Sequence, residues 1–204
     1  MLTGTQLVNA SLDACEAALV RHGFRRLRRH DVVFDLSREF LGWVGLNYGN
    51  YRTRVRINPF VGIHCVPLMK LVAELSGKKY RMGSVATFAV HLGTICPDVD
   101  VVEFFSETEL ETESERLAKT LAQYAVPYMR SLASYEALLP LLQERVPMLG
   151  GYPQMVTAAL YLMGRKEEAR QFVLAKRAEY GTASKIARES FDRFAIPFLR
   201  LLNN

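Results

Sequence analysis

The stretch from Phe40 to Cys65 constrains the fold more than any other part of the sequence, because it holds the densest run of β-forming residues. Strand formers lie on both sides of Tyr48-Gly49-Asn50-Tyr51, a cluster of turn-forming residues. This pattern predicts a β-hairpin that reverses direction at residues 48–51. Strands are expected over 41–47 and 51–58, and a further strand is possible over 60–65.

Arginine alternates with Thr, Val and Ile along residues 52–57. Successive side chains of a strand point to opposite faces of the sheet, so Arg52, Arg54 and Arg56 are predicted to share one face. The opposite face is predicted to pack on helices, which leaves the arginine-bearing face in contact with water.

The rest of the chain predicts an α+β fold. It would consist of an N-terminal helix and an antiparallel sheet of about four to five strands, followed by a C-terminal helical bundle. Residues 85–95 fit either a strand or a short buried helix, and Ser106 to Glu109 fit a capping box. The division expected from this pattern is a sheet part over 1–105 and a helical part over 106–204 packed on it, or one single domain. The individual predictions are helices over 5–22, from Pro67 to Gly77, and over 135–144, 153–163, 166–180 and 184–202, with two short strands flanking His30-Asp31.

The charged residues are sorted along the chain. Residues 98–115 hold eight acidic and no basic side chains, although the formal net charge of the chain is +5. A concentrated negative surface can steer a basic partner, and a simple solvated loop and helix start is the other interpretation. The candidate partner-binding residues are the acids Asp98, Asp100, Glu103, Glu107, Glu109, Glu111 and Glu113 and the bases Arg52, Arg54 and Arg56.

No catalytic, metal-binding or cofactor-binding motif stands out in the sequence. There is no G-x-S-x-G, no phosphate-binding glycine loop and no C-x-x-C pair. No apolar run is long enough for a membrane span, and the three cysteines favour a reducing cytosol over a disulfide framework. The sequence therefore predicts a cytoplasmic protein without a cofactor that is not an enzyme, although a hydrolase using Cys65 or Cys96 is an alternative.

Several stretches taken together carry a family resemblance. They are Gly23-Phe24-Arg25, Gly42-Trp43-Val44-Gly45-Leu46, Glu74-Leu75-Ser76-Gly77-Lys78-Lys79-Tyr80, Leu92-Gly93-Thr94-Ile95-Cys96-Pro97 and Pro127-Tyr128-Met129-Arg130-Ser131-Leu132-Ala133-Ser134. The chain resembles a family of small bacterial proteins and the α+β immunity proteins that guard against contact-dependent and other polymorphic toxins. The resemblance implies a role class and no particular binding residues.

Two functional hypotheses follow. In the first, the chain binds a cognate toxin, with a nuclease as the expected class, and covers its active or substrate-binding surface. The acidic block would then imitate phosphate charge. In the second, the arginine face of the sheet, with Trp43, Tyr48 and Tyr51 nearby in sequence, holds single-stranded nucleic acid.

Overall fold

The computed structural model describes residues 4–28, 30–96, 99, 101–146, 152–182 and 185–203. The chain forms two compact units. The first, here called the sheet unit, comprises residues 1–64 and 83–133, and the second, the helical unit, comprises residues 65–82 and 134–204. The boundary predicted at residue 105 differs from the bounds of these two units. Whether the two predicted parts are separate domains stays a prediction.

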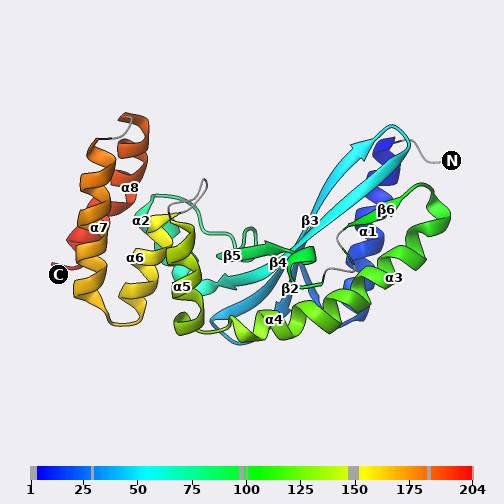
Figure 1. The fold of residues 1–204 in the computed structure, drawn as a ribbon, viewed down its shortest axis with the longest axis horizontal. Coiled ribbons are helices and arrows are strands. Elements are labelled where there is room, and N and C mark those ends of the chain that lie inside the picture. Colours follow the sequence, from blue (N-terminus) through cyan, green and yellow to red (C-terminus); the bar gives the residue numbers. More distant parts are fainter. Residues whose placement is uncertain are drawn as a thin grey trace. The chain divides into compact units, whose positions relative to one another are not determined.

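The sheet unit contains one six-stranded antiparallel sheet in the order β1-β2-β3-β4-β5, and β6 also pairs with β4 (Figure 1). β5 pairs with β4 at Phe60–Ile63 and β6 pairs with β4 at Val55–Ile57, so they contact successive parts of one strand. The predicted α+β class is confirmed. The strands are β1 (Arg25–Arg28), β2 (Asp31–Asp35), β3 (Phe40–Tyr51), β4 (Arg54–Cys65), β5 (Phe88–His91) and β6 (Val102–Phe104).

The central hairpin differs from the prediction in its turn. β3 continues through Gly49 to Tyr51, and the chain reverses at Arg52 and Thr53. The Tyr51 ring covers Gly49 so closely that a Cβ there would lie 2.9 Å from Tyr51 Cε2, so this glycine accommodates a ring where a turn was expected. Arg52 therefore lies in the turn, and only Arg54 and Arg56 of the predicted trio belong to the strand.

The two strands predicted over 51–58 and 60–65 are wrong as separate elements, because β4 runs unbroken through both. Pro59 has no amide hydrogen to donate to a neighbouring strand. It lies between the segment of β4 that pairs with β6 and the segment that pairs with β5. A proline is therefore tolerated inside the strand because it falls where the partner changes.

One face of the sheet is covered by α1 (Gly4–Arg21) and α3 (Leu110–Thr120), which also pack on each other. On β4 this covered face consists of alternate residues that are fully buried, such as Val55 and Ile57. Leu12 and Leu19 of α1 and Leu117 of α3 complete the core. The alternation predicted for β4 is thus confirmed.

The segment that the sequence left undecided, residues 85–95, contains β5 followed by a single 3₁₀ turn, η1 (Leu92–Thr94). β5 approaches β4 closely at Gly62, where a Cβ would lie 1.9 Å from the Phe88 carbonyl oxygen. Close approach of two backbones requires glycine here. The helix α3 leads through a π-helical segment, η3 (Leu121–Ala125), into α4 (Val126–Ser131). Pro127 stands in the first turn of α4, a position that a proline tolerates.

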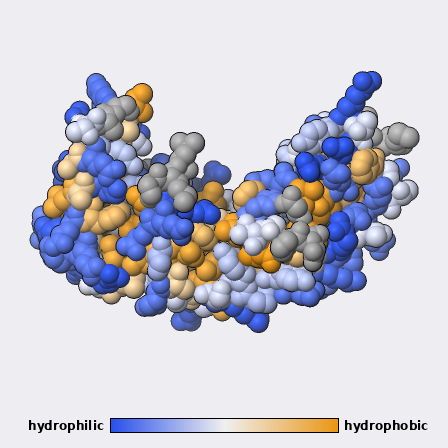
Figure 2. All heavy atoms as spheres, in the orientation of Figure 1, coloured by the Kyte–Doolittle hydropathy of each residue, from blue (hydrophilic) through white to orange (hydrophobic). Residues whose placement is uncertain are grey.

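The helical unit consists of α2 (Val66–Leu75), α5 (Tyr135–Arg145), α6 (Pro153–Leu162), α7 (Lys166–Gly181) and α8 (Lys185–Leu201). α6 and α7 correspond to the helices predicted over 153–163 and 166–180 and form a hairpin, with Gly164 at φ +78° in the connection. The inner face of α8 is aromatic, and Phe194 stacks on Phe198 with ring centroids 5.8 Å apart. Figure 2 shows hydrophilic residues along the outer side of α7. Among the described residues, no helix is both long and apolar enough to cross a bilayer.

Candidate binding surface

The candidate binding surface lies in the sheet unit, around β4, β6 and the start of α3. Arg56 and Glu103 are directly opposite each other in the β4–β6 ladder. Glu103 Oε1 lies 3.0 Å from Arg54 Nε and 3.5 Å from Arg56 Nε. Both arginine side chains are 38% exposed, so this three-residue cluster is open to a partner. The predicted acidic and basic sets therefore meet at Glu103.

The remaining acids of the block are distributed over the 3₁₀ turn η2 (Glu107–Glu109) and α3. Glu109 accepts a hydrogen bond from the backbone N–H of Phe105 at 2.7 Å, and Glu113 pairs with Arg116 one turn later. Glu107 and Glu111 are exposed, and neither has a partner among the described residues. Asp98 and Asp100 lie outside the described residues.

The predicted capping box is wrong. Glu109 bonds back to the backbone amide of Phe105, one residue before the position expected. The Ser106 hydroxyl bonds to the Thr108 hydroxyl at 2.8 Å and caps no amide. The bond from the Phe105 amide to Glu109 fixes the backbone directly after β6, where Phe105 is 52% exposed.

These residues surround an open hollow of about 370 Å³. Its chemistry is mixed, with three carboxylates, one guanidinium and two apolar side chains. Such a lining suits a long basic side chain, whose charge would meet carboxylates while its stem contacts Phe105. The hollow, called here the β6–α3 hollow, is lined by Val101, Glu103, Phe105, Glu109, Glu113 and Arg116.

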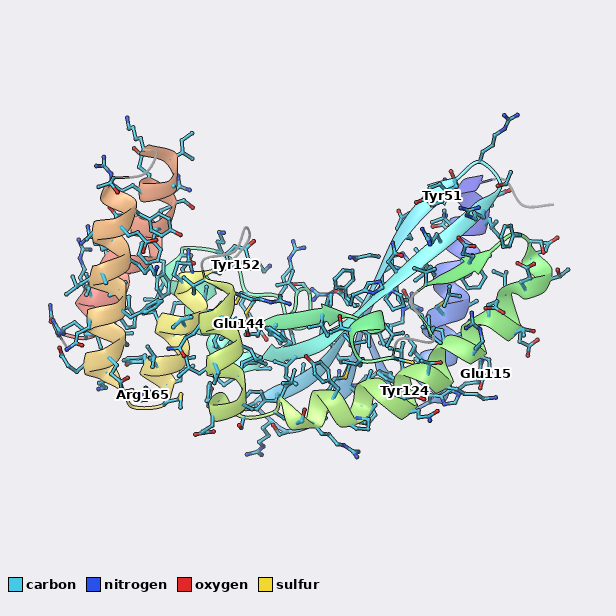
Figure 3. All side chains as sticks on the ribbon, viewed as in Figure 1. Tyr51, Glu115, Tyr124, Glu144, Tyr152 and Arg165 are labelled. Carbon is cyan, nitrogen blue, oxygen red and sulfur yellow. The ribbon has the colours of Figure 1, made fainter. Side chains whose placement is uncertain are left out.

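An exposed aromatic ring flanks this charged cluster. Tyr51 is 47% exposed, and the Arg54 guanidinium lies 5.3 Å from the centre of its ring. Tyr48, which is 54% exposed, lies three residues before Tyr51 in β3 and so projects from the opposite face of the strand. Figure 3 shows Tyr51 near the turn of the β3–β4 hairpin and Glu115 on α3. Figure 2 shows hydrophobic atoms near β6 surrounded by hydrophilic ones. Half-exposed aromatic and arginine side chains are the residues that dominate protein interfaces.

Three arginines of β1 are paired with acids. Arg25 forms two hydrogen bonds to Asp35, which lower the pKa of the Asp35 carboxyl, and Arg28 pairs with Asp31. Arg26 pairs with Glu16 of α1. These three arginines therefore do not extend the basic surface of Arg54 and Arg56.

The thiols are inaccessible. Cys65 and Cys96 are 0% and 2% exposed, so a substrate cannot reach either sulfur in this conformation. Burial raises the pKa of the Cys15 thiol to about 12. Among the described residues, no group of three or more His, Cys, Asp and Glu side chains could hold a metal ion.

His64 is fully buried on β4 and holds the loop that follows α2. Its Nδ1 lies 2.7 Å from the Val85 carbonyl oxygen, and its Nε2 accepts a hydrogen bond from the Gly83 N–H at 3.3 Å. The Gly83 carbonyl in turn accepts from the Trp43 indole. Burial lowers the pKa of His64, which keeps the ring neutral in this network.

Phe105 is not among the predicted binding residues, although the alternation along β6 carries a signal for it. In β6, Val102 and Phe104 are buried, while Glu103 and Phe105 are accessible. Strict alternation over four residues predicts this arrangement. Arg116 was also missed, and its position three residues after Glu113 on a helix was the available signal. No family model, curated protein or solved structure matches the chain in the three comparisons made.

Proposed function

We propose that the chain is an immunity protein that binds a bacterial protein toxin in the cytoplasm and blocks it by covering its active or substrate-binding surface. The observation that carries the proposal is the β6–α3 hollow, where Glu103, Glu109 and Glu113 surround an exposed Phe105. A nuclease must present basic side chains to the phosphates of its substrate. Such side chains fit this hollow, so the proposed class of toxin is a nuclease.

Two further features support a protein partner. Glu107 and Glu111 lack partners among the described residues, so their charge is available to attract a basic surface. The exposed rings of Tyr51 and Phe105 supply the apolar contact area that a stable interface needs alongside charge.

Binding of single-stranded nucleic acid is the second candidate function. The contact between Arg54 and the Tyr51 ring favours it, because aromatic rings with nearby cations can hold unpaired bases. Glu103 weighs against it, since its carboxylate contacts both strand arginines and would repel phosphates. We therefore rank a protein partner first.

The test is co-expression with the protein encoded by the adjacent reading frame, scored by growth and by size-exclusion chromatography. The wild-type chain is expected to restore growth and to elute in a complex. Replacing four carboxylates with isosteric amides should abolish rescue, while an equal loss of charge in the helical unit should leave it intact. The two variants are E107Q/E109Q/E111Q/E113Q and, as control, E167Q/E168Q/E179Q/E189Q. Failure of the wild-type chain to rescue growth or to form a complex would refute the proposal.

A further inference from the structure

The arginine pair on β4 carries more positive charge than its surroundings neutralise. Arg54 and Arg56 project from the accessible face of the strand, while their neighbours Val55 and Ile57 are fully buried on the other face. Among the described residues, the one carboxylate near both guanidiniums is that of Glu103, which presents the same oxygen, Oε1, to both. Within the part of the chain that the structure describes, one guanidinium charge of the pair therefore remains uncompensated.

The hydrogen-bonding capacity of this pair is also unfilled. The Nε atoms of Arg54 and Arg56 are buried, yet neither makes a hydrogen bond of good geometry. Each guanidinium has five N–H donors in a planar fork that matches a carboxylate. A partner cannot reach the buried Nε atoms, so a second carboxylate would bind the terminal N–H groups of the two side chains, each of which is 38% exposed.

Tyr51 is held in place beside the pair. Its ring lies against Gly49, where any Cβ would contact the ring, and the Arg54 guanidinium lies 5.3 Å from its centre. An aromatic ring that is already positioned costs little entropy when a partner packs on it. The ring and the two guanidiniums together form a small surface with an apolar part and a cationic part, here called the Tyr51–Arg56 patch, which consists of Tyr51, Arg54, Arg56 and Glu103.

We propose that the Tyr51–Arg56 patch binds an acidic side chain, Asp or Glu, on the surface of a protein partner. The inference rests on the proposed function and deepens it, because it assigns a negatively charged contact to the toxin next to the basic one that enters the β6–α3 hollow. The surface of a folded protein can present a single carboxylate to Arg54 and Arg56 without bringing further negative charge close to the acids of the β6–α3 hollow. A nucleic acid strand brings a row of phosphates, which Glu103, Glu109 and Glu113 would repel.

The first experiment observes the arginine Nε–Hε signals of the full chain by NMR. The probe is a serine decapeptide with a single central glutamate, acetylated at its N-terminus and amidated at its C-terminus. Matched probes are the same peptide with glutamine and a ten-residue oligothymidylate. We expect the glutamate peptide to shift the Arg54 and Arg56 signals selectively and the glutamine peptide to shift neither. Equal shifts at Arg165, which is 40% exposed and paired with Glu168 in the helical unit, would overturn the inference, as would no shift at millimolar peptide.

The second experiment compares variants with the same peptide. R54Q/R56Q is expected to bind the glutamate peptide about tenfold more weakly or worse, because two charge-assisted contacts are lost. R165Q should bind as the wild type does. E103Q should bind more tightly, since the internal competitor for the guanidiniums is neutralised, and this gain cannot arise from misfolding. Weaker or unchanged binding by E103Q would overturn the inference, and so would tighter binding of the oligothymidylate than of the peptide.

The result is separable from the test of the proposed function. If R54Q/R56Q restores growth and binds the adjacent protein as well as the wild type does, the immunity function stands and the acidic contact is refuted. If the peptide binds selectively but the adjacent protein does not bind, the patch stands and the assigned partner is refuted.

Discussion

Removal of the buried carboxylate of Glu16 is the most informative test of how the sheet unit is held together. Glu16 lies on α1 and its side chain is 1% exposed. Its Oε1 accepts a hydrogen bond from the backbone N–H of His30 at 2.6 Å and lies 2.6 Å from His30 Nδ1, while Oε2 lies 2.9 Å from Arg26 Nε. A single carboxylate thus joins α1 to strand β1, through Arg26, and to the turn that follows it, through His30.

His30 adopts φ +68°, a left-handed conformation that residues other than glycine rarely take. That conformation costs on the order of 1 kcal/mol and persists because surrounding contacts hold it. Both hydrogen-bonding groups of His30 that contact Glu16 depend on this backbone geometry. The Glu16 carboxylate is therefore the contact that keeps the turn in its strained form.

We predict that Glu16→Ala lowers the free energy of unfolding by about 2–3 kcal/mol. The figure allows about 1 kcal/mol for each of the three contacts, which is below the usual range of about 1.5–3 kcal/mol for hydrogen bonds to charged groups. The lower value is used because Arg26 and His30 are 47% and 37% exposed and regain water. For a chain of this length, that loss corresponds to a fall in Tm of about 5–10 °C. Urea unfolding followed by circular dichroism, together with thermal melting, measures both quantities.

Asp35→Ala is the matched control. Asp35 also accepts two hydrogen bonds, from Arg25, but its side chain is 56% exposed. Surface ion pairs contribute about 0–1 kcal/mol, so this variant should change stability by less than 1 kcal/mol. His30→Gly should cost less than Glu16→Ala, because glycine relieves the backbone strain while losing one contact. If Glu16→Ala and Asp35→Ala lower the free energy of unfolding equally, burial does not strengthen the contacts of Glu16.

Three further predictions concern pH, packing and the proposed interface. Burial lowers the pKa of His64 below its ordinary value of about 6.5, so the unfolded chain binds more protons than the folded chain below that pH. The free energy of unfolding should therefore fall as the pH drops from about 6.5 toward the lowered pKa, by at most about 1.4 kcal/mol per pH unit. His64→Gln should flatten this slope in urea titrations at pH 7.5, 6.5 and 5.5, and an unchanged slope would contradict the assignment. Gly62→Ala should destabilise the chain by about 1–3 kcal/mol and increase amide exchange in β5, because the new Cβ would meet the Phe88 carbonyl, whereas Gly181→Ala, with open space around it, should be neutral. Phe105→Ala should weaken complex formation with the toxin by about tenfold or more in a pull-down titration while leaving the melting temperature unchanged, since the ring is 52% exposed, and an equal affinity would show that the ring is not in the interface.

The fold class and most elements could be predicted from local patterns. The N-terminal helix, the α6–α7 hairpin and the alternation along β4 follow from periodicity that no distant contact changes. The turn of the central hairpin could not be predicted, because Gly49 and Asn50 are turn formers in isolation. The deciding fact is the placement of the Tyr51 ring over Gly49, which is visible only once the strand exists. Pro59 misled the prediction for a similar reason, since its tolerance depends on which strand it faces.

The candidate surface was predictable in composition and not in arrangement. Charge counting identified the acids and the strand arginines, but it treated them as separate surfaces. Their meeting at Glu103 depends on the pairing of β6 with β4, two segments almost fifty positions apart in the sequence. The same limit applies to Glu16, whose role depends on the β1–β2 turn reaching α1.

The central claim is that the β6–α3 hollow and its neighbouring acids bind a basic surface on a protein partner. Titration calorimetry of the full chain with the protein encoded by the adjacent reading frame tests it most directly. The account predicts one-to-one binding by the wild-type chain, about a hundredfold weaker binding by E107Q/E109Q/E111Q/E113Q, and unchanged binding by E167Q/E168Q/E179Q/E189Q. Equal affinities for all three proteins would contradict it.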